Sequence, residues 1–289
     1  MKLFDYLLYG AVIFGWSTSW LPLKWQLGVV APEVSIFWRF LMAALVMFLL
    51  TKLATKENLW LSWRDHLRIM PMGVCLFSLN FTLFYYGGLN STSGLLAVVF
   101  STASLINIFL VAVLQQQMPR LVHLLAALIG FLGVGLIYSP MLTSQANGFI
   151  GLMLCLSGTL VFCTGNMISS RNQKQGLPVM ASTSWGMLYG VIVLGLVSLV
   201  RGHSFTIEWT PHYIGGLFWL SFVSSVMAFT AYLTLLGRIG PGRAGYATVI
   251  FPVGALLLST FFEAYQWTPI AFVGLVFVLT GNILMLRSR

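Results

Sequence analysis

The chain has 289 residues, of which 58% are apolar and only 7% are Asp, Glu, Lys or Arg. An average soluble domain carries about 25% charged residues, so this chain lacks the polar material to coat a surface in water. Its net charge of +9 does not indicate a nucleic-acid partner either, because the basic residues are sparse and lie between apolar runs.

Ten apolar segments follow one another along the chain with only short connections. Each approaches the 20 or so residues that a helix needs to cross roughly 30 Å of hydrocarbon, and each is much longer than a barrel strand of about 9–11 residues. We therefore predict an all-α integral membrane protein, surrounded by lipid, whose spans cover approximately residues 4–23, 34–53, 68–87, 93–114, 121–141, 148–169, 179–200, 213–236, 244–263 and 268–286.

The basic residues are distributed unevenly about these segments. If the N-terminus is cytoplasmic, only Lys24 and Arg201 fall on the opposite side of the membrane, and only Arg39 lies inside a span. This bias follows the positive-inside rule and favours an even number of spans. We expect a multi-pass protein of the cytoplasmic (inner) membrane with both termini in the cytoplasm.

Short matches recur along the chain at a near-constant offset. SGLLAVVF at 93–100 matches AGYATVIF at 244–251 at an offset of 151, and Phe-Thr occurs at both 81–82 and 229–230, at an offset of 148. An offset of this size predicts two repeats of five helices each. Because five is odd, the second repeat enters the membrane from the opposite side.

The two inverted repeats are expected to cover residues 1–142 and 143–289 of one membrane domain. Inverted repeats are typical of alternating-access transporters, which hold their substrate near the midplane where the repeats meet. A gene duplication without any transport role is the alternative interpretation.

Four segments carry a resemblance to a known family: FGWSTSWLPLK at 14–24, FWRFLMAALV at 37–46, NSTSGLLAVVFSTASL at 90–105 and GPGRAGYATVIFPVGALLLS at 240–259. With the repeats, they resemble the drug/metabolite transporter superfamily, specifically its EamA-type ten-helix exporters. The resemblance implies a central cavity lined by helices one, three, four, six, eight and nine. It also implies outward transport of amino acids, other metabolites or drugs, and it leaves open a homodimer through the fifth and tenth helices.

One departure from the family pattern concerns the fourth helix. That helix often carries a proline where this chain has Ser104 or its neighbours, whereas the ninth helix keeps Pro252. We therefore expect the two halves to bend unequally.

Acidic residues are absent from the middle of every predicted span. An intramembrane carboxylate is the usual counter-ion for a cationic cargo and the usual proton carrier. Its absence disfavours the first alternative function, export of drugs or hydrophobic cations. The sequence also contains no catalytic, metal-binding or phosphate-binding motif, so we expect no cofactor and no enzyme, with a lipid enzyme kept as an alternative interpretation.

Uncharged polar and aromatic side chains inside the spans are the candidates for a substrate site. Trp16 and Trp20 are four residues apart and share a helix face, and asparagine is costly to expose to lipid. Serine or threonine can instead hold helices together, and Trp20 can belong to an interfacial belt. The candidate binding residues are Trp16, Ser17, Trp20, Asn80, Tyr85, Asn107, Asn166, Trp219, Ser225 and Tyr246.

Arg39 is the one charge inside a predicted span, about 8 Å from the outer start of its helix. It can snorkel to the surface, bond backbone carbonyls, or meet a substrate carboxylate near the outer mouth; we favour a structural or gating role. The sequence as a whole predicts an exporter of small neutral or zwitterionic metabolites such as amino acids. A membrane scaffold without transport activity is the second alternative function.

Overall fold

The computed structural model describes residues 3–89, 91–114, 116, 118, 120–144, 148–244 and 247–287, and all regular elements in these residues are helices. In chain order they are α1 Leu3–Ser17, α2 Trp20–Lys24, α3 Pro32–Ala54, α4 Trp63–Val74, η1 Cys75–Leu79, α5 Asn80–Gly88, α6 Ser93–Ser101, α7 Ala103–Leu114, α8 Leu121–Ser144, α9 Gly148–Lys174, α10 Val179–Val200, α11 Pro211–Phe218, η2 Trp219–Ala228, α12 Phe229–Ala244, α13 Ala247–Phe262 and α14 Pro269–Arg287.

These elements form ten helical segments within the described residues. Four of them are composite: α1 with α2, α4 with η1 and α5, α6 with α7, and α11 with η2 and α12. Seven helices are long and apolar enough to cross a membrane, and two shorter apolar helices cover Ala247–Phe262 and Pro269–Leu284. The predicted all-α, ten-segment membrane fold is confirmed. Large apolar side chains such as Leu45, Leu128 and Phe272 are exposed on its surface, as lipid contact requires.

The first segment is broken where the sequence predicts one continuous span, 4–23. Thr18 and Ser19 lie between α1 and α2, and their hydroxyls donate to the carbonyls of Phe14 and Trp16 at 2.8 and 3.1 Å. Pro22 has no amide hydrogen to continue the helical ladder across this point. The two hydroxyls add further bonds to carbonyls that also accept from the Thr18 and Ser19 amides, and Ser19 lies at the break between Trp16 and Trp20.

The fourth segment also breaks, although it lacks the proline that the family pattern often has there. α6 ends at Ser101 and α7 begins at Ala103, whereas α13 runs through Pro252 without interruption. The hydroxyls of Ser101 and Thr102 donate to carbonyls three residues earlier, at 2.7 Å each. The two counterpart helices therefore do bend unequally, and the half without the proline has the break.

Two stretches of π-helix occupy corresponding places in the two halves. η1 interrupts the third segment and η2 the eighth, and the sequence offset of 148 places the counterpart of η1 inside η2. A π-helical turn holds an extra residue and is frequent at functional sites. Here η1 ends shortly before Phe81 and η2 ends directly before Phe229, and these are the phenylalanines of the recurring Phe-Thr pair.

Helix packing follows a pseudo-twofold exchange of the two halves. α3 packs on its counterpart α10, α6 on α13, and α8 on α14; α1 packs on η2 and α12 as α9 packs on η1 and α5. Phe81 contacts its counterpart Phe229 with ring centroids 6.0 Å apart, and Phe100 contacts Phe251 at 5.8 Å. Residues that match in the sequence therefore meet on the axis, as two inverted repeats require.

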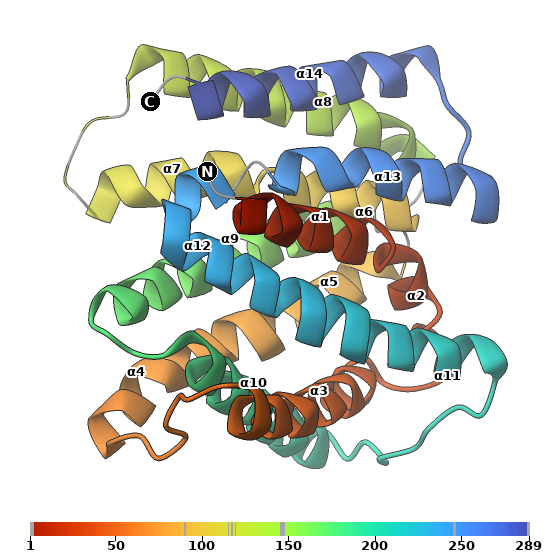
Figure 1. Cartoon of the computed structure of the whole chain (residues 1–289). Helices are drawn as coiled ribbons and strands as arrows, with labels where there is room; N and C mark the ends of the chain where they lie inside the picture. Colours follow the sequence, from red (N-terminus) through yellow and green to blue (C-terminus); the bar gives the residue numbers. More distant parts are fainter. Residues whose placement is uncertain are drawn as a thin grey trace.

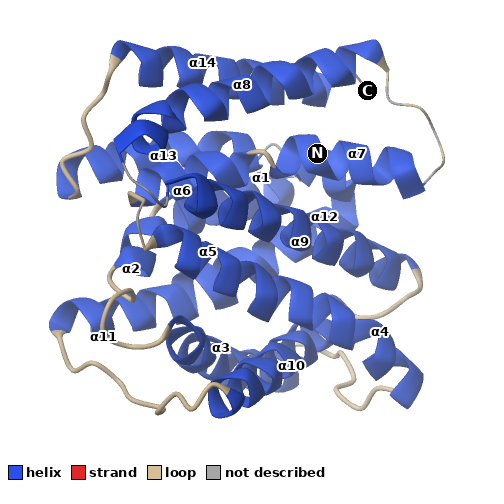
Figure 2. Ribbon diagram, turned by 180° about the vertical axis from the view of Figure 1, so that it is seen from behind, coloured by secondary structure: helices blue, strands red, loops and turns tan. Residues whose placement is uncertain are grey.

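The views in Figures 1 and 2 place α8 and α14 along one side of the bundle and α3 and α10 along the opposite side. The start of α1 and the end of α14 lie toward the same end of the bundle, which we call the terminal end. The opposite end is called the far end. The predicted repeat boundary at residue 142 falls within α8 and stays a prediction.

Candidate functional site

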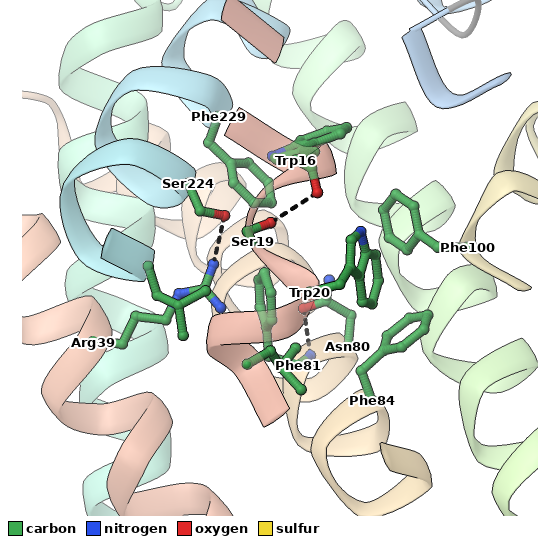
Figure 3. A pocket seen from close by; sticks show the side chains of 12 residues that line it. Trp16, Ser19, Trp20, Arg39, Asn80, Phe81, Phe84, Phe100, Ser224 and Phe229 are labelled. Atoms are coloured by element: carbon green, nitrogen blue, oxygen red, sulfur yellow. Dashed lines mark hydrogen bonds between the residues drawn. The ribbon is translucent and has the colours of Figure 1, made fainter. Parts of the chain in front are cut away.

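A small cavity lies where helices of the two halves converge, between α1, α2, α3, α5, α6, η2 and α12 (Figure 3). Its volume is about 30 Å³, and it is lined by Trp16, Ser19, Trp20, Leu23, Arg39, Asn80, Phe81, Phe84, Phe100, Leu220, Ser224 and Phe229. A volume of this size holds a water molecule or two and no metabolite. A substrate can enter only if the helices around the cavity move apart.

Aromatic rings form one wall of the cavity. Trp16 is 5% exposed, and its ring lies 4.8–6.0 Å, centroid to centroid, from five others: Phe100, Phe162, Phe229, Tyr232 and Phe251. Trp20 contacts Phe84 and Phe100 edge-on or tilted and stacks on Phe251. These rings come from both halves, so they can separate only if the two halves move apart.

The opposite wall is polar. Arg39 reaches it from α3 and donates from Nε to Ser225 Oγ at 2.9 Å and from Nη2 to Ser224 Oγ at 3.1 Å. Figure 3 shows Arg39 and Ser224 on one side of the cavity and Trp20, Phe84 and Phe100 on the other. The cavity is therefore two-sided, with a cationic, hydroxyl-bearing wall facing an aromatic wall.

The structure brings three of the predicted binding residues to the cavity surface: Trp16, Trp20 and Asn80. Arg39 joins them, and at 1% exposure it does not snorkel to the membrane surface. Trp20 is 8% exposed and packs among rings, so it is not the interfacial-belt tryptophan that the sequence allows as an alternative. The role of these residues in substrate binding stays a prediction.

The other predicted binding residues lie behind the lining or elsewhere. Ser17 donates to the Phe251 carbonyl at 3.0 Å, Ser225 accepts from Arg39, and the Trp219 indole donates to Thr18 Oγ1 at 3.2 Å. These three therefore brace the segments that carry the lining.

The remaining predicted residues are buried or undescribed. Tyr85 lies beside Arg39. Asn166 donates to Tyr232 Oη at 3.1 Å, and the Asn107 amide has no hydrogen-bond partner. The prediction for Tyr246 falls outside the described residues.

Besides Arg39, eight cavity residues are missing from the predicted binding residues, and four of them are phenylalanines. Phe81, Phe229 and Phe100 belong to the recurring matches between the halves. Because near-axis residues of inverted repeats meet at the midplane, those matches were a usable signal for cavity residues. Leu23, Phe84 and Leu220 carry no comparable signal.

Polar ties close the far end of the bundle. Arg201, at the end of α10, donates to Glu33 Oε1 on α3 at 2.7 Å, and Tyr86 donates to the same carboxylate at 3.0 Å. Glu263, after α13, accepts from the Ser93 amide at 2.9 Å and thereby caps the start of α6. The Arg201–Glu33 and Ser93–Glu263 ties join the two halves.

The far end also holds Lys24, just beyond the first predicted span, whose Nζ donates to the Gly88 carbonyl at 2.7 Å. Burial lowers the pKa of Lys24, and the nearby Glu263 carboxylate opposes that shift. At the terminal end, Arg238 of α12 donates to Asp5 of α1 at 2.7 Å. Each end of the bundle therefore has an ion pair between the two halves, Glu33–Arg201 at the far end and Asp5–Arg238 at the terminal end.

Among the described residues, no group of three or more His, Cys, Asp or Glu could hold a metal ion. All Asp and Glu side chains lie in the described part of the chain, and none of them lines the cavity. The cavity has the chemistry to bind a solute through rings, amide and guanidinium.

Comparisons with known proteins agree with this architecture. The sequence matches the EamA-like transporter family twice, over residues 3–139 and 149–287. It is 23% identical to "Probable amino-acid metabolite efflux pump" of Escherichia coli (strain K12) over 96% of this chain and 94% of that protein. It is 22% identical to "Protein PecM" of Dickeya dadantii (strain 3937) over 99% of this chain and 92% of that protein.

A solved crystal structure has the same fold, with a TM-score of 0.71 at 14% identity, over 97% of this chain and 95% of the other. The two family matches cover the two five-helix halves and together span nearly the whole chain. This chain therefore belongs to the EamA-like transporter family and is a multi-pass membrane transporter of the drug/metabolite superfamily.

Proposed function

We propose that this transporter exports small neutral or zwitterionic metabolites, with amino acids as the leading class, by alternating access. The observation that carries the proposal is the two-sided cavity at the joint between the halves, closed by side-chain ties at both ends. Rings can hold an apolar side group while polar groups orient the rest. The name of the Escherichia coli relative supports the same class of cargo.

The proposed cycle follows from the closed cavity. Its volume of about 30 Å³ is too small for a metabolite, so loading requires the ties at one end to open while those at the other end hold. Opening of the terminal end breaks Asp5–Arg238, and opening of the far end breaks Glu33–Arg201. The charge bias of the sequence supports the terminal end as the cytoplasmic side and the inner membrane as the location.

The alternative of a hydrophobic-cation exporter is disfavoured by the lining itself. Arg39 contributes a positive charge and no carboxylate opposes it at the cavity. A cationic cargo would meet repulsion in a medium of low dielectric constant. A homodimer through α8 and α14 stays a prediction from family resemblance.

Flux measurements test the proposal directly. Purified protein in liposomes should release preloaded labelled neutral amino acids faster than protein-free liposomes, and should not move cationic dyes. A parallel test is rescue of cells from toxic amino acids when the protein is overproduced. Dye flux without amino-acid flux would favour the cation exporter, and no flux of any solute would favour the scaffold.

Trp16→Ala tests the site. We expect flux to fall while the amount of protein in the membrane is kept, because the aromatic wall loses its central ring. Trp209→Ala is a matched control, since Trp209 is 83% exposed. Equal losses of flux and abundance in Trp16→Ala would show that Trp16 serves packing alone.

A further inference from the structure

We propose that Arg39 is the receptor for a carboxylate on the transported molecule, so that the cargo of this protein is carboxylate-bearing. The inference rests on the proposed function and narrows it from small metabolites to acids and amino acids. The apolar part of the cargo would lie against the aromatic wall, on the side of Trp20, Phe84 and Phe100 (Figure 3).

The first step concerns the hydrogen bonds of Arg39. A guanidinium has five N–H donors in a planar fork. In Arg39, Nε and Nη2 bond to the hydroxyls of Ser225 and Ser224. Nη1 is buried and makes no hydrogen bond of standard geometry to any described residue, although the Tyr85 hydroxyl lies beside the guanidinium. The side chain is 1% exposed and lines the cavity, so the unmet donor belongs to a residue that a solute in the cavity would meet.

The second step is the charge. All six Asp and Glu side chains are described, and each bonds to a group other than Arg39: Asp5 to Arg238, Glu33 to Arg201, Glu57 to the Ala181 amide, Asp65 to Arg68, Glu208 to Thr210, and Glu263 to Ser93. The described neighbours of Arg39 are three neutral hydroxyls, those of Ser224, Ser225 and Tyr85, and the rings of Phe81 and Phe40, whose centroids lie 4.3 and 5.0 Å from Cζ. A buried charge without a counter-ion is costly, so an anion that enters gains strongly.

The third step is whether the buried polar atoms without a hydrogen bond are donors or acceptors. The cavity-lining atoms that are buried without a hydrogen-bond partner are Arg39 Nη1 and the Trp20 indole nitrogen Nε1, and both are donors. The Tyr85 hydroxyl is buried beside the Arg39 guanidinium and interacts with it, but it makes no hydrogen bond of standard geometry to any described residue. A site with unmet donors matches a ligand rich in acceptors, and a carboxylate offers two oxygens without a donor.

A structural role for Arg39 is the competing explanation. Its bonds to Ser224 and Ser225 fasten α3 to η2 and would be made with or without a cargo. That role accounts for two of the nitrogens and does not use Nη1. The two explanations differ in one measurable respect: only a receptor discriminates a carboxylate from its neutral isostere.

The experiment compares L-phenylalanine with L-phenylalaninamide, which keeps the side chain and ammonium and replaces the carboxylate by a neutral amide. Binding to purified full-length protein is measured by thermal stabilisation over a concentration series. For the wild type we expect the acid to bind about ten- to a hundredfold more tightly than the amide. We expect 3-phenylpropanoate, which lacks the ammonium, to bind as well.

Arg39→Gln should abolish this preference, because it weakens the binding of the acid and leaves the binding of the amide little changed. Arg39→Lys should restore part of the preference, because lysine supplies a point charge. Arg171→Gln is the matched control, because Arg171 is an exposed cation at the end of α9. Equal weakening of acid and amide in Arg39→Gln would establish the structural role and overturn the proposal. If that variant does not fold, the wild-type comparison decides alone: equal binding of acid and amide overturns the receptor.

The two proposals fail in different ways. Amino-acid flux by the wild type with no preference for the acid would leave the transport function standing and overturn the receptor. Absence of flux with an Arg39-dependent preference for the acid would overturn the transport function and leave the carboxylate site standing.

Discussion

Two pairs of counterpart helices lie on opposite sides of the bundle, and they are held together by different means (Figure 1). In the α8–α14 pair, backbones touch through glycines. A Cβ atom placed on Gly133 would lie 2.6 Å from the Gly274 carbonyl oxygen, and one on Gly281 would lie 2.6 Å from the Ala126 carbonyl oxygen. Contacts this close leave no freedom for the two helices to slide.

The α3–α10 pair is tied by polar side chains along its length. Arg201 and Glu33 join it at the far end, and Thr51 and Ser184 hydroxyls lie 3.1 Å apart near the terminal end. Beyond that, Glu57 accepts from the Ala181 amide in the first turn of α10 at 2.9 Å. Such bonds can be exchanged for bonds to water or to other partners without any change in backbone packing.

The comparison indicates a division of labour between the pairs. α8 and α14 form a fixed support away from the cavity, whereas α3 carries Arg39 into the cavity and is held by bonds that can open. Substitutions that touch the first pair should therefore change stability, and substitutions that touch the second should change transport more than stability.

The largest expected effect is that of Gly133→Ala on stability. The added methyl group overlaps the α14 backbone, so we expect a loss of about 1–3 kcal/mol, measured by thermal unfolding in detergent. Gly135→Ala, in the same helix, meets nothing within 4 Å and should be neutral or stabilising. Equal effects of the two substitutions would remove the evidence for a glycine-packed support.

A smaller loss of stability is expected for Arg201→Gln, about 1–2 kcal/mol, because Arg201 is half exposed while Glu33 is buried. Transport should change more, since the far end opens more readily once this tie is gone. The measurement is the rate of amino-acid flux beside the thermal midpoint. Arg68→Gln removes an exposed pair with Asp65 and should change neither; unchanged flux in Arg201→Gln would contradict a role for this tie in gating.

The smallest effect is predicted for Thr51→Val, which removes a hydroxyl at nearly constant shape. The bond to Ser184 should be worth about 0.6 kcal/mol, the usual value between membrane helices. Thr164→Val is a suitable comparison, because the Thr164 hydroxyl is exposed and bonds only within its own helix. A loss well above that of Thr164→Val would mean that α3 and α10 are as firmly joined as α8 and α14.

The membrane fold could be predicted from the sequence because each span carries its own signal of length and polarity. The break at Thr18 and Ser19 and the π-helical stretches could not, because they depend on which carbonyls the hydroxyls reach and on packing between halves. Short internal matches were enough to indicate the repeat, because two repeats with the same backbone fold need similar residues where their helices pack closely.

The candidate site was predictable only in part. Trp16, Trp20 and Asn80 stand out in a span because rings with a polar handle and amides are costly in lipid. Phe84 does not, since a phenylalanine that faces lipid and one that faces a cavity look alike in a sequence. Arg39 could be recognised in the sequence as a charge inside a span. That no Asp or Glu side chain lies beside it can be established only from the structure, which gives the positions of all six.

The π-helical stretches decide which way the residues around them face. Successive residues of a helix are rotated by about 100°, so one residue added or removed in η1 or η2 turns everything on one side of it by that angle relative to the other. Removing one residue from η1 would swing Phe81 off the axis relative to α4, and removing one from η2 would do the same to Phe229. In an alignment of relatives, a single-residue gap at either stretch is thus a change of face, with consequences for the cavity that a gap in a loop would not have.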